Sequence, residues 1–120
     1  MNDKQKQMQT KLKSVKAMRQ DLAMLTERCK TYETICAGAE LKKYKKELSE
    51  QKRRLLERID SIQDEINKLD DSVERNVLSM YYIDCMQMPA IAEKMFYSEQ
   101  WLWTKHRSGI THLNSLWKNS

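Results

Sequence analysis

Chain-breaking residues are almost absent from this sequence. Its 120 residues include only two glycines, Gly38 and Gly109, and a single proline, Pro89. Lys, Glu, Leu, Met and Gln, which all favour helices, fill many of the remaining positions. Long helices are therefore the structures that this chain can form most readily, and we expect an all-α fold.

Apolar side chains recur at alternating spacings of three and four residues in two long segments. The first stripe consists of Met8, Lys11, Val15, Met18, Leu22, Leu25, Cys29, Tyr32 and Cys36, with Lys11 as its only charged member. The second consists of Leu41, Tyr44, Leu48, Gln51, Leu55, Ile59, Ile62, Ile66, Leu69 and Val73. Narrow stripes of this period are typical of helices that pair along a seam. Residues 1–69 are thus predicted to form a helical coiled-coil arm.

Gly38 lies between the two stripes and leaves two arrangements of the arm open. Glycine readily takes the left-handed conformation that ends a helix, so residues 37–40 could form the bend of an antiparallel hairpin. An isolated glycine costs only about 1 kcal/mol inside a helix, so one very long helix that pairs with a second copy is the alternative. The second arrangement predicts a homodimer.

Residues 70–120 are expected to form a unit of three shorter helices. Asp70, Asp71 and Ser72 offer capping oxygens to a helix over about residues 73–84. Pro89 suits the first turn of a helix over about 88–95, and Ser98 suits the N-cap of a last helix that reaches about residue 116. Two helices separated by such a tight turn form a helix-turn-helix pattern.

Several segments of this unit carry a family resemblance. They are Arg75-Asn76-Val77-Leu78, Tyr82-Ile83-Asp84, Ile91-Ala92-Glu93-Lys94-Met95 and Tyr97-Ser98. Together they resemble the fourth conserved region of bacterial sigma factors, and Trp101 and His106 bring residues 69–117 closer to phage-encoded sigma-like regulators, including ArpU-type activators. The resemblance implies a phage or prophage transcription regulator whose last helix enters the major groove of double-stranded DNA, with RNA polymerase as a second partner to consider.

Helical geometry divides the last helix into two faces. At about 100° per residue, the core face carries Leu102, His106, Gly109, Ile110, Leu113 and Trp117, flanked by Trp103 and Leu116. The opposite face carries the residues expected to contact DNA, namely Gln100, Trp101, Thr104, Arg107, Ser108 and Thr111. We expect base contacts from Gln100 and Arg107, a base or phosphate contact from Thr104, and phosphate contacts from Lys94, Lys105 and Lys118.

The net charge of +5 is concentrated in the arm. Residues 1–40 carry eight basic and five acidic side chains, residues 41–70 nine and seven, and residues 71–120 five of each. Phosphate contacts are expected from the middle of the chain, at Lys42, Lys45, Lys46, Arg53 and Arg54, although a solvated helix surface explains the same run.

The neutral C-terminal unit keeps a second function open, since basic patches normally mark DNA-binding faces. In this alternative the chain is an interaction module or inhibitor. It would dock on polymerase or another protein through its helix-turn-helix and an exposed Trp101, without reading DNA.

Other functional classes lack their characteristic residues. The three cysteines occur without a CxxC or HxxxH pattern, which predicts free thiols in a reducing compartment and no metal site. Without a glycine-rich loop or a Ser/His/Asp pattern, we expect neither catalysis nor a cofactor. The longest apolar stretches fall far short of the roughly 20 residues of a membrane helix, so we expect no membrane partner and a location in the cytoplasm of a bacterial host cell.

Overall fold

The computed structural model describes residues 3–118, with the backbone alone for Trp117 and Lys118. Its elements are α1 (Asp3–Ile35), α2 (Gly38–Ile66), α3 (Ser72–Leu78), the single π-helical turn η1 (Ser79–Ile83), α4 (Met88–Met95) and α5 (Glu99–Lys118). No strand occurs in this range, which confirms the all-α class. The predicted roles of Trp117 in the core and of Lys118 at a phosphate concern side chains outside the described part.

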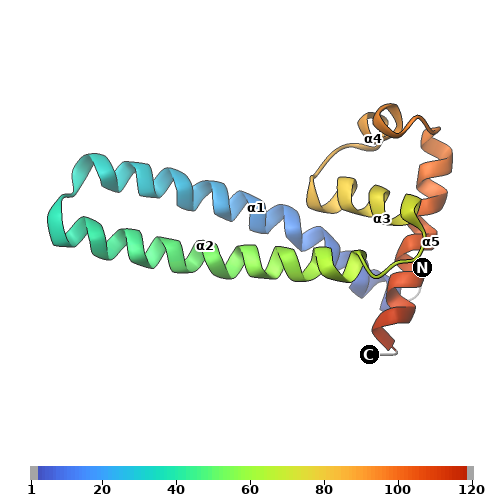
Figure 1. Cartoon of the computed structure of the whole chain (residues 1–120), viewed down its shortest axis with the longest axis horizontal. Coiled ribbons are helices and arrows are strands. Elements are labelled where there is room, and N and C mark those ends of the chain that lie inside the picture. Colours follow the sequence, from blue (N-terminus) through green and yellow to red (C-terminus); the bar gives the residue numbers. More distant parts are fainter. Residues whose placement is uncertain (1–2, 119–120) are drawn as a thin grey trace.

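The arm is an antiparallel hairpin of α1 and α2 (Figure 1). The chain reverses at Ala37 and Gly38, and Gly38 takes the left-handed conformation, with φ +64°. Beside this bend the rings of Tyr32 and Tyr44 stack with their centroids 4.7 Å apart. Of the two arrangements that the sequence left open, the chain adopts the one in which Gly38 turns it back on itself.

The two stripes bury each other along the hairpin. The buried residues of α1 are Met8, Leu12, Val15, Met18 and Leu25, and those of α2 are Leu48, Ile59, Ile62 and Ile66. The prediction is corrected at two positions, since Leu12 rather than Lys11 is buried in the first stripe and Gln51 of the second stripe is exposed. Leu12 lines a hollow with Tyr82 of η1 and Trp103 of α5, whereas Lys11 lies at the edge of the seam. There its ammonium pairs with Glu65 at 2.9 Å.

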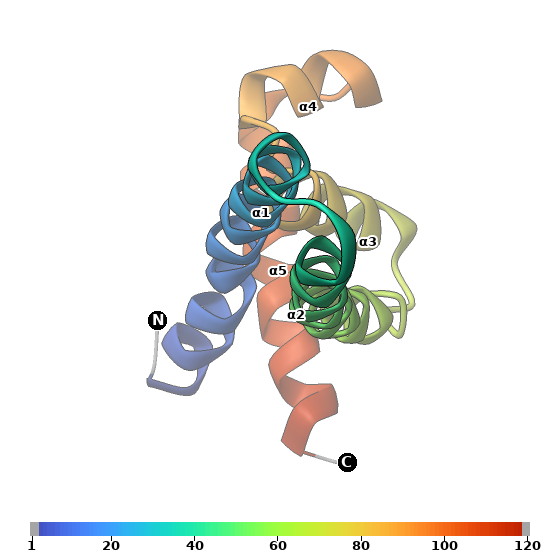
Figure 2. The same cartoon turned by 90° about the vertical axis from the view of Figure 1, so that its left-hand side faces the viewer.

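The arm and the C-terminal unit share one hydrophobic core. Its buried side chains come from α1, α2, α3, η1, α4 and α5, from Met8 to Leu113. The N-terminal half of α1 passes beside η1 and α5, and Arg19 donates a hydrogen bond to the carbonyl of Ile83. The half of the hairpin near Gly38 projects away from this core (Figure 1), and Figure 2 views the molecule from that end, with α1 and α2 side by side in front.

The third predicted helix is divided into α3 and η1. Asp71 caps α3 by accepting hydrogen bonds from the backbone N–H groups of Val73 at 2.8 Å and Glu74 at 3.1 Å. In η1 the N–H of Asp84 reaches back five residues to the carbonyl of Ser79 at 3.0 Å, which widens the last turn. The sequence pattern predicted that this segment is helical, but it could not predict which other elements the turn contacts.

Gly109 brings α5 close to α3. A Cβ atom added there would lie 3.0 Å from Cδ1 of Leu78 and 3.4 Å from Cβ of Glu74. The glycine therefore permits a close helix approach, as its position on the core face indicated.

Candidate nucleic-acid interface

The turn between α4 and α5 is built as the sequence indicated. Pro89 lies in the first turn of α4, and the helix ends at Phe96, which is left-handed with φ 60°. The hydroxyl of Ser98 then accepts a hydrogen bond from the N–H of Trp101 at 3.2 Å and so caps α5. These local bonds hold the first turns of α5 at the edge of the molecule, beside α4 (Figure 1).

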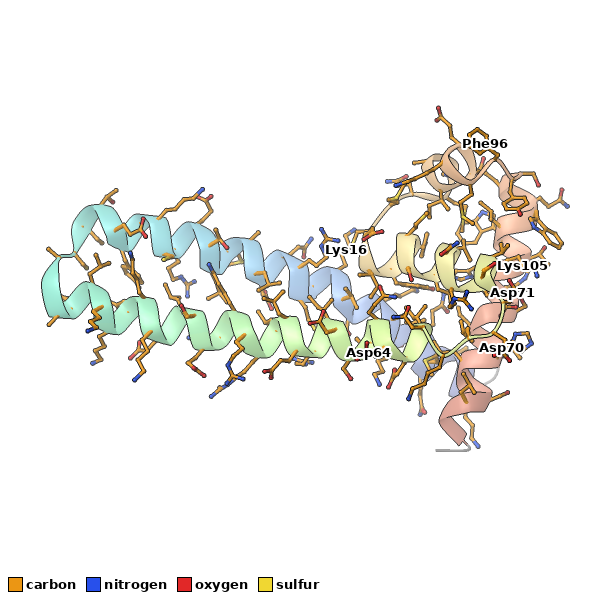
Figure 3. The ribbon with its side chains drawn as sticks, viewed as in Figure 1. Lys16, Asp64, Asp70, Asp71, Phe96 and Lys105 are labelled. Atoms are coloured by element: carbon orange, nitrogen blue, oxygen red, sulfur yellow. The ribbon has the colours of Figure 1, made fainter. Side chains whose placement is uncertain are left out.

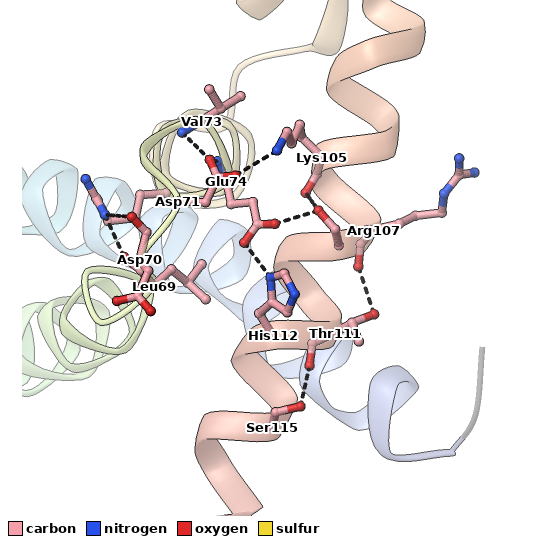
Figure 4. A network of polar contacts seen from close by, with 12 residues as sticks. Leu69, Asp70, Asp71, Val73, Glu74, Lys105, Arg107, Thr111, His112 and Ser115 are labelled. Carbon is pink, nitrogen blue, oxygen red and sulfur yellow. Dashed lines mark hydrogen bonds and ion pairs between the residues drawn. The ribbon is translucent and has the colours of Figure 1, made fainter.

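Three exposed polar residues form a row on the first half of α5. Gln100, Thr104 and Arg107 follow one another at spacings of four and three residues, opposite the buried Leu102 and His106. Within residues 3–118, the side chains of Gln100 and Arg107 form no hydrogen bond or ion pair, and Arg107 extends away from the neighbouring helices (Figure 4). This row is free to bind another molecule.

Lys105 and Ser108, which are predicted to contact DNA, join α5 to α3, and Figure 4 shows Lys105 beside Asp71. The ammonium of Lys105 lies 2.7 Å from Oδ2 of Asp71, and the Ser108 hydroxyl donates to Oε2 of Glu74 at 2.6 Å. The hydrogen bond between Lys105 and Asp71 raises the pKa of the lysine and lowers that of the carboxyl. Both residues lie on the flank of α5 where α3 packs, so their polar groups bind carboxylates of the neighbouring segment.

The buried carboxylate of Glu74 holds a second link between these helices. It is only 2% exposed and lies 2.8 Å from Nδ1 of His112 as well as near Ser108. The sequence offered no signal for this role, since Glu74 also suits the first turn of a solvated helix.

Thr111 is placed against the arm. Its hydroxyl accepts a hydrogen bond from Nε2 of Gln5 at 2.9 Å and donates one to the carbonyl of Arg107 at 3.1 Å. The start of α1 therefore lies beside the second half of α5. Of the predicted DNA-binding face, Gln100, Trp101, Thr104, Arg107 and Thr111 are exposed, and Ser108 is half-buried.

Exposed aromatic rings surround the turn before α5. Phe96 is 92% exposed, and Tyr97 and Trp101 are each 44% exposed. Figure 3 shows Phe96 at the outer edge of the molecule, and the Lys105 ammonium lies 5.0 Å from the centroid of the Trp101 ring. We call Phe96, Tyr97 and Trp101 the turn patch.

Trp103 is more exposed than we expected. It was predicted to lie in the core, but 38% of it is accessible. Its ring packs edgewise on Tyr81 and His106, with centroids 5.6 Å and 5.3 Å away. The flank position of Trp103 on α5 puts one face of the indole on the core and the other in solvent.

His106 is the buried core residue that its position predicted. Its Nε2 forms a hydrogen bond with the hydroxyl of Tyr82 at 2.7 Å, and Gln9 of α1 donates to the same hydroxyl at 3.3 Å. Burial, with smaller contributions from Arg107 and Lys13, lowers the pKa of His106 to about 4. Burial also raises the pKa of Tyr82 to about 12. This pair is therefore uncharged at neutral pH and links the arm to α5.

Two lysines that the sequence did not single out flank α5. Lys13 and Lys16 of α1 line a hollow of about 580 Å³ together with Glu99 and Trp103 of α5. Neither lysine forms an ion pair or side-chain hydrogen bond in the described part of the chain, and Lys16 is labelled in Figure 3. Their spacing on one face of α1 was visible in the sequence, but their proximity to α5 was not.

Several other cations that we assigned to phosphate contacts lie outside α5. Lys94 is exposed in the last turn of α4, close to the turn patch in sequence. The remaining ones lie on the projecting half of the hairpin, remote from α5 (Figure 1), and they are Lys42, Lys45, Lys46, Arg53 and Arg54. Lys45 pairs with Glu33 at 3.0 Å, and Arg53 pairs with Glu50 at 3.0 Å and Glu57 at 2.6 Å.

The described residues include no group of three His, Cys, Asp or Glu side chains that could hold a metal ion. Over the same range, no helix combines the length and the apolar composition that crossing a membrane requires.

The fold and the site define a class of protein, an all-α chain in which a helical hairpin supports a helix-turn-helix unit. The model of one protein family, described as "Protein of unknown function (DUF1492)", matches residues 27–114, so the chain belongs to this family. No curated protein and no solved structure matches it significantly.

Proposed function

We propose that the chain is a phage or prophage DNA-binding transcription regulator. In this proposal the first half of α5 enters the major groove, Gln100 and Arg107 contact base edges, and Thr104 contacts a base or a phosphate. Asparagine, glutamine and arginine side chains match the donor and acceptor patterns of base edges in this groove.

The observation that carries the proposal is the row of exposed polar side chains on the first half of α5, in which those of Gln100 and Arg107 form no hydrogen bond or ion pair within residues 3–118. Gln100, Thr104 and Arg107 are exposed at the end of α5 that a helix-turn-helix inserts into DNA. Lys13 and Lys16 lie on the flank of this helix, where a sugar-phosphate backbone would run, and they supply the positive charge that the C-terminal unit lacks. In this proposal the arm contributes to DNA binding through α1, beside α5.

An electrophoretic mobility shift with DNA that flanks the protein's own gene tests this function. Arg107→Ala and Gln100→Ala should each cost roughly 1 to 3 kcal/mol on the preferred site and relax sequence preference there. Arg53→Ala is the matched control, because Arg53 is an exposed arginine held by two glutamates on the far part of the hairpin. Equal affinity of the wild-type protein for every duplex, unchanged by Arg107→Ala, would reject base reading by α5.

The turn patch favours a second candidate function, docking on a protein such as RNA polymerase. Three adjacent exposed aromatic side chains are costly to leave in water and are enriched at protein interfaces. Surface plasmon resonance with purified polymerase distinguishes this candidate, because Trp101→Ala should then weaken polymerase binding at least tenfold while Arg107→Ala leaves it unchanged.

A further inference from the structure

One side of the hairpin carries a groove between α1 and α2, formed by two hollows that share Arg58. On α2 this groove runs from Ile62 to Gln51, which is about 17 Å by the helical rise per residue. A third hollow, lined by α2 alone, adjoins it through Gln51 and Arg54 and extends to Lys43. The groove and the third hollow together span about five turns of a helix.

The central hollow combines an apolar floor with a positively charged rim. Its volume is about 360 Å³, and Leu25, Leu55 and the 58% exposed Met24 supply its apolar surface. The rim is formed by three guanidinium groups, those of Arg28, Arg54 and Arg58.

The three arginines are available to a ligand. Across residues 3–118 none of them forms an ion pair or a side-chain hydrogen bond, and Asp21 is the carboxylate among the residues that line the hollow. The neighbouring Arg53, in contrast, is held by Glu57 and by Glu50, and Glu50 lines the third hollow. Arg28 of α1 and Arg54 and Arg58 of α2 therefore place three unpaired guanidinium groups around the central hollow.

We infer that this groove binds an acidic amphipathic helix of a partner protein. A groove between two packed helices has the shape that receives a third helix, and helix-in-groove recognition uses apolar anchors at spacings of three and four residues. Such anchors would cover Met24, Leu25 and Leu55, while flanking carboxylates would form paired hydrogen bonds with the arginines. The partner site is separate from α5 and does not depend on the proposed function.

Charge and shape argue against two other occupants of the groove, a second copy of the arm and a DNA duplex. A second copy of the arm would bring more positive charge, because residues 1–70 carry seventeen basic and twelve acidic side chains. A DNA duplex is much wider than one helix, so its phosphates would contact the rim and leave the apolar floor uncovered. An acidic amphipathic helix satisfies both surfaces.

A fluorescence anisotropy titration with the full-length protein tests this inference. The probe is a labelled synthetic 18-residue helical peptide with leucines on one face and glutamates on both sides of that face. Arg54→Glu combined with Arg58→Glu should weaken its binding at least tenfold, and Met24→Gln should weaken it severalfold. Arg53→Glu reverses one arginine that does not line the groove and should leave binding within twofold, with circular dichroism confirming that each variant is folded.

Three results would overturn the inference. The first is equal binding of the peptide by the Arg54→Glu/Arg58→Glu and Arg53→Glu variants. The second is no binding of the peptide combined with a loss of DNA affinity in the groove variant, which would assign these arginines to phosphates. The third is a wild-type dimer in sedimentation velocity that Met24→Gln dissociates, which would assign the groove to a second copy. Binding of a peptide with lysines in place of glutamates by the Arg54→Glu/Arg58→Glu variant would support the inference.

Discussion

The ammonium of Lys105 lies 2.7 Å from Oδ2 of Asp71, so the residue that caps α3 also holds the middle of α5. This contact fixes the position of the first half of α5 relative to the rest of the unit. The charge of Lys105 is therefore paired with a carboxylate of the protein itself, on the helix that carries the candidate interface.

Two substitutions separate the roles of Asp71. Asp71→Asn retains an oxygen that can cap α3 but removes the charge, whereas Asp71→Ala removes both. Loss of an N-cap costs about 1 kcal/mol, so Asp71→Ala should be less stable than Asp71→Asn by about that amount in urea denaturation. Because the pKa of Asp71 is lowered in the folded protein, its charge-dependent contribution is complete above the unfolded pKa and disappears as the pH falls through the folded value. Equal stability of the two variants would show that the cap contributes nothing.

His106 should make the protein less stable in mild acid. Its pKa is about 4 in the folded chain against 6.5 for an unperturbed histidine, so between these pH values the unfolded chain binds a proton that the folded chain does not. The free energy of unfolding should therefore fall as the pH decreases from about 6.5 to about 4, by up to about 3 kcal/mol. Urea denaturation across this range checks the slope, which His106→Gln should flatten. A slope that His106→Gln leaves unchanged would assign the effect to other groups.

Replacement of Phe96 by glycine should stabilise the folded protein. Phe96 holds φ 60° while its ring is almost fully exposed, so the fold retains an unfavourable backbone conformation without burying the side chain. Phe96→Gly should raise the free energy of unfolding by up to about 1 kcal/mol, whereas Phe96→Ala, which keeps the Cβ atom, should not. If Phe96 contacts a partner, both variants lose that contact, so binding and stability report different properties. A lower Tm for Phe96→Gly than for Phe96→Ala would contradict this view of the turn.

Gly38 should control the choice between a hairpin and a long helix. No atom lies within 4 Å of an added Cβ, so Gly38→Ala carries only the conformational cost of a left-handed residue, about 1 kcal/mol. The same change favours a continuous helix through the bend. We expect a lower Tm and, at high concentration, more dimer in sedimentation velocity than for Ala37→Gly. A Gly38→Ala variant with the stability of wild type would mean that the bend does not need glycine.

Lys13 and Lys16 should determine part of the salt dependence of DNA binding. Replacing both by Gln removes two phosphate contacts and should reduce the slope of log K against log salt by about 1.8, with sequence preference retained. Lys42→Gln with Lys46→Gln is the matched control, because these lysines lie near the bend, remote from α5 (Figure 1). A larger change in the control pair would place the main phosphate contacts on the projecting half of the hairpin.

Local signals in the sequence determined the elements of this fold. The spacing of apolar residues predicted both long helices, Gly38 marked the bend as one of two arrangements, and Pro89 and Ser98 placed the starts of α4 and α5. These features depend on a helix, a turn or a cap, each of which is decided by residues within a few positions of one another. The buried position of His106 followed from the same helical period.

Only the tertiary structure decided which polar residues remain free. Lys105, Ser108 and Thr111 share the polar side of α5 with Gln100 and Arg107, but Asp71, Glu74 and Gln5 engage them because α3 and α1 pack on either flank. The position of Lys13 beside α5 depends on a contact between residues more than eighty positions apart. Helical period fixes the direction of a side chain from its own axis, but the partners that occupy that direction are set by the packing of distant elements.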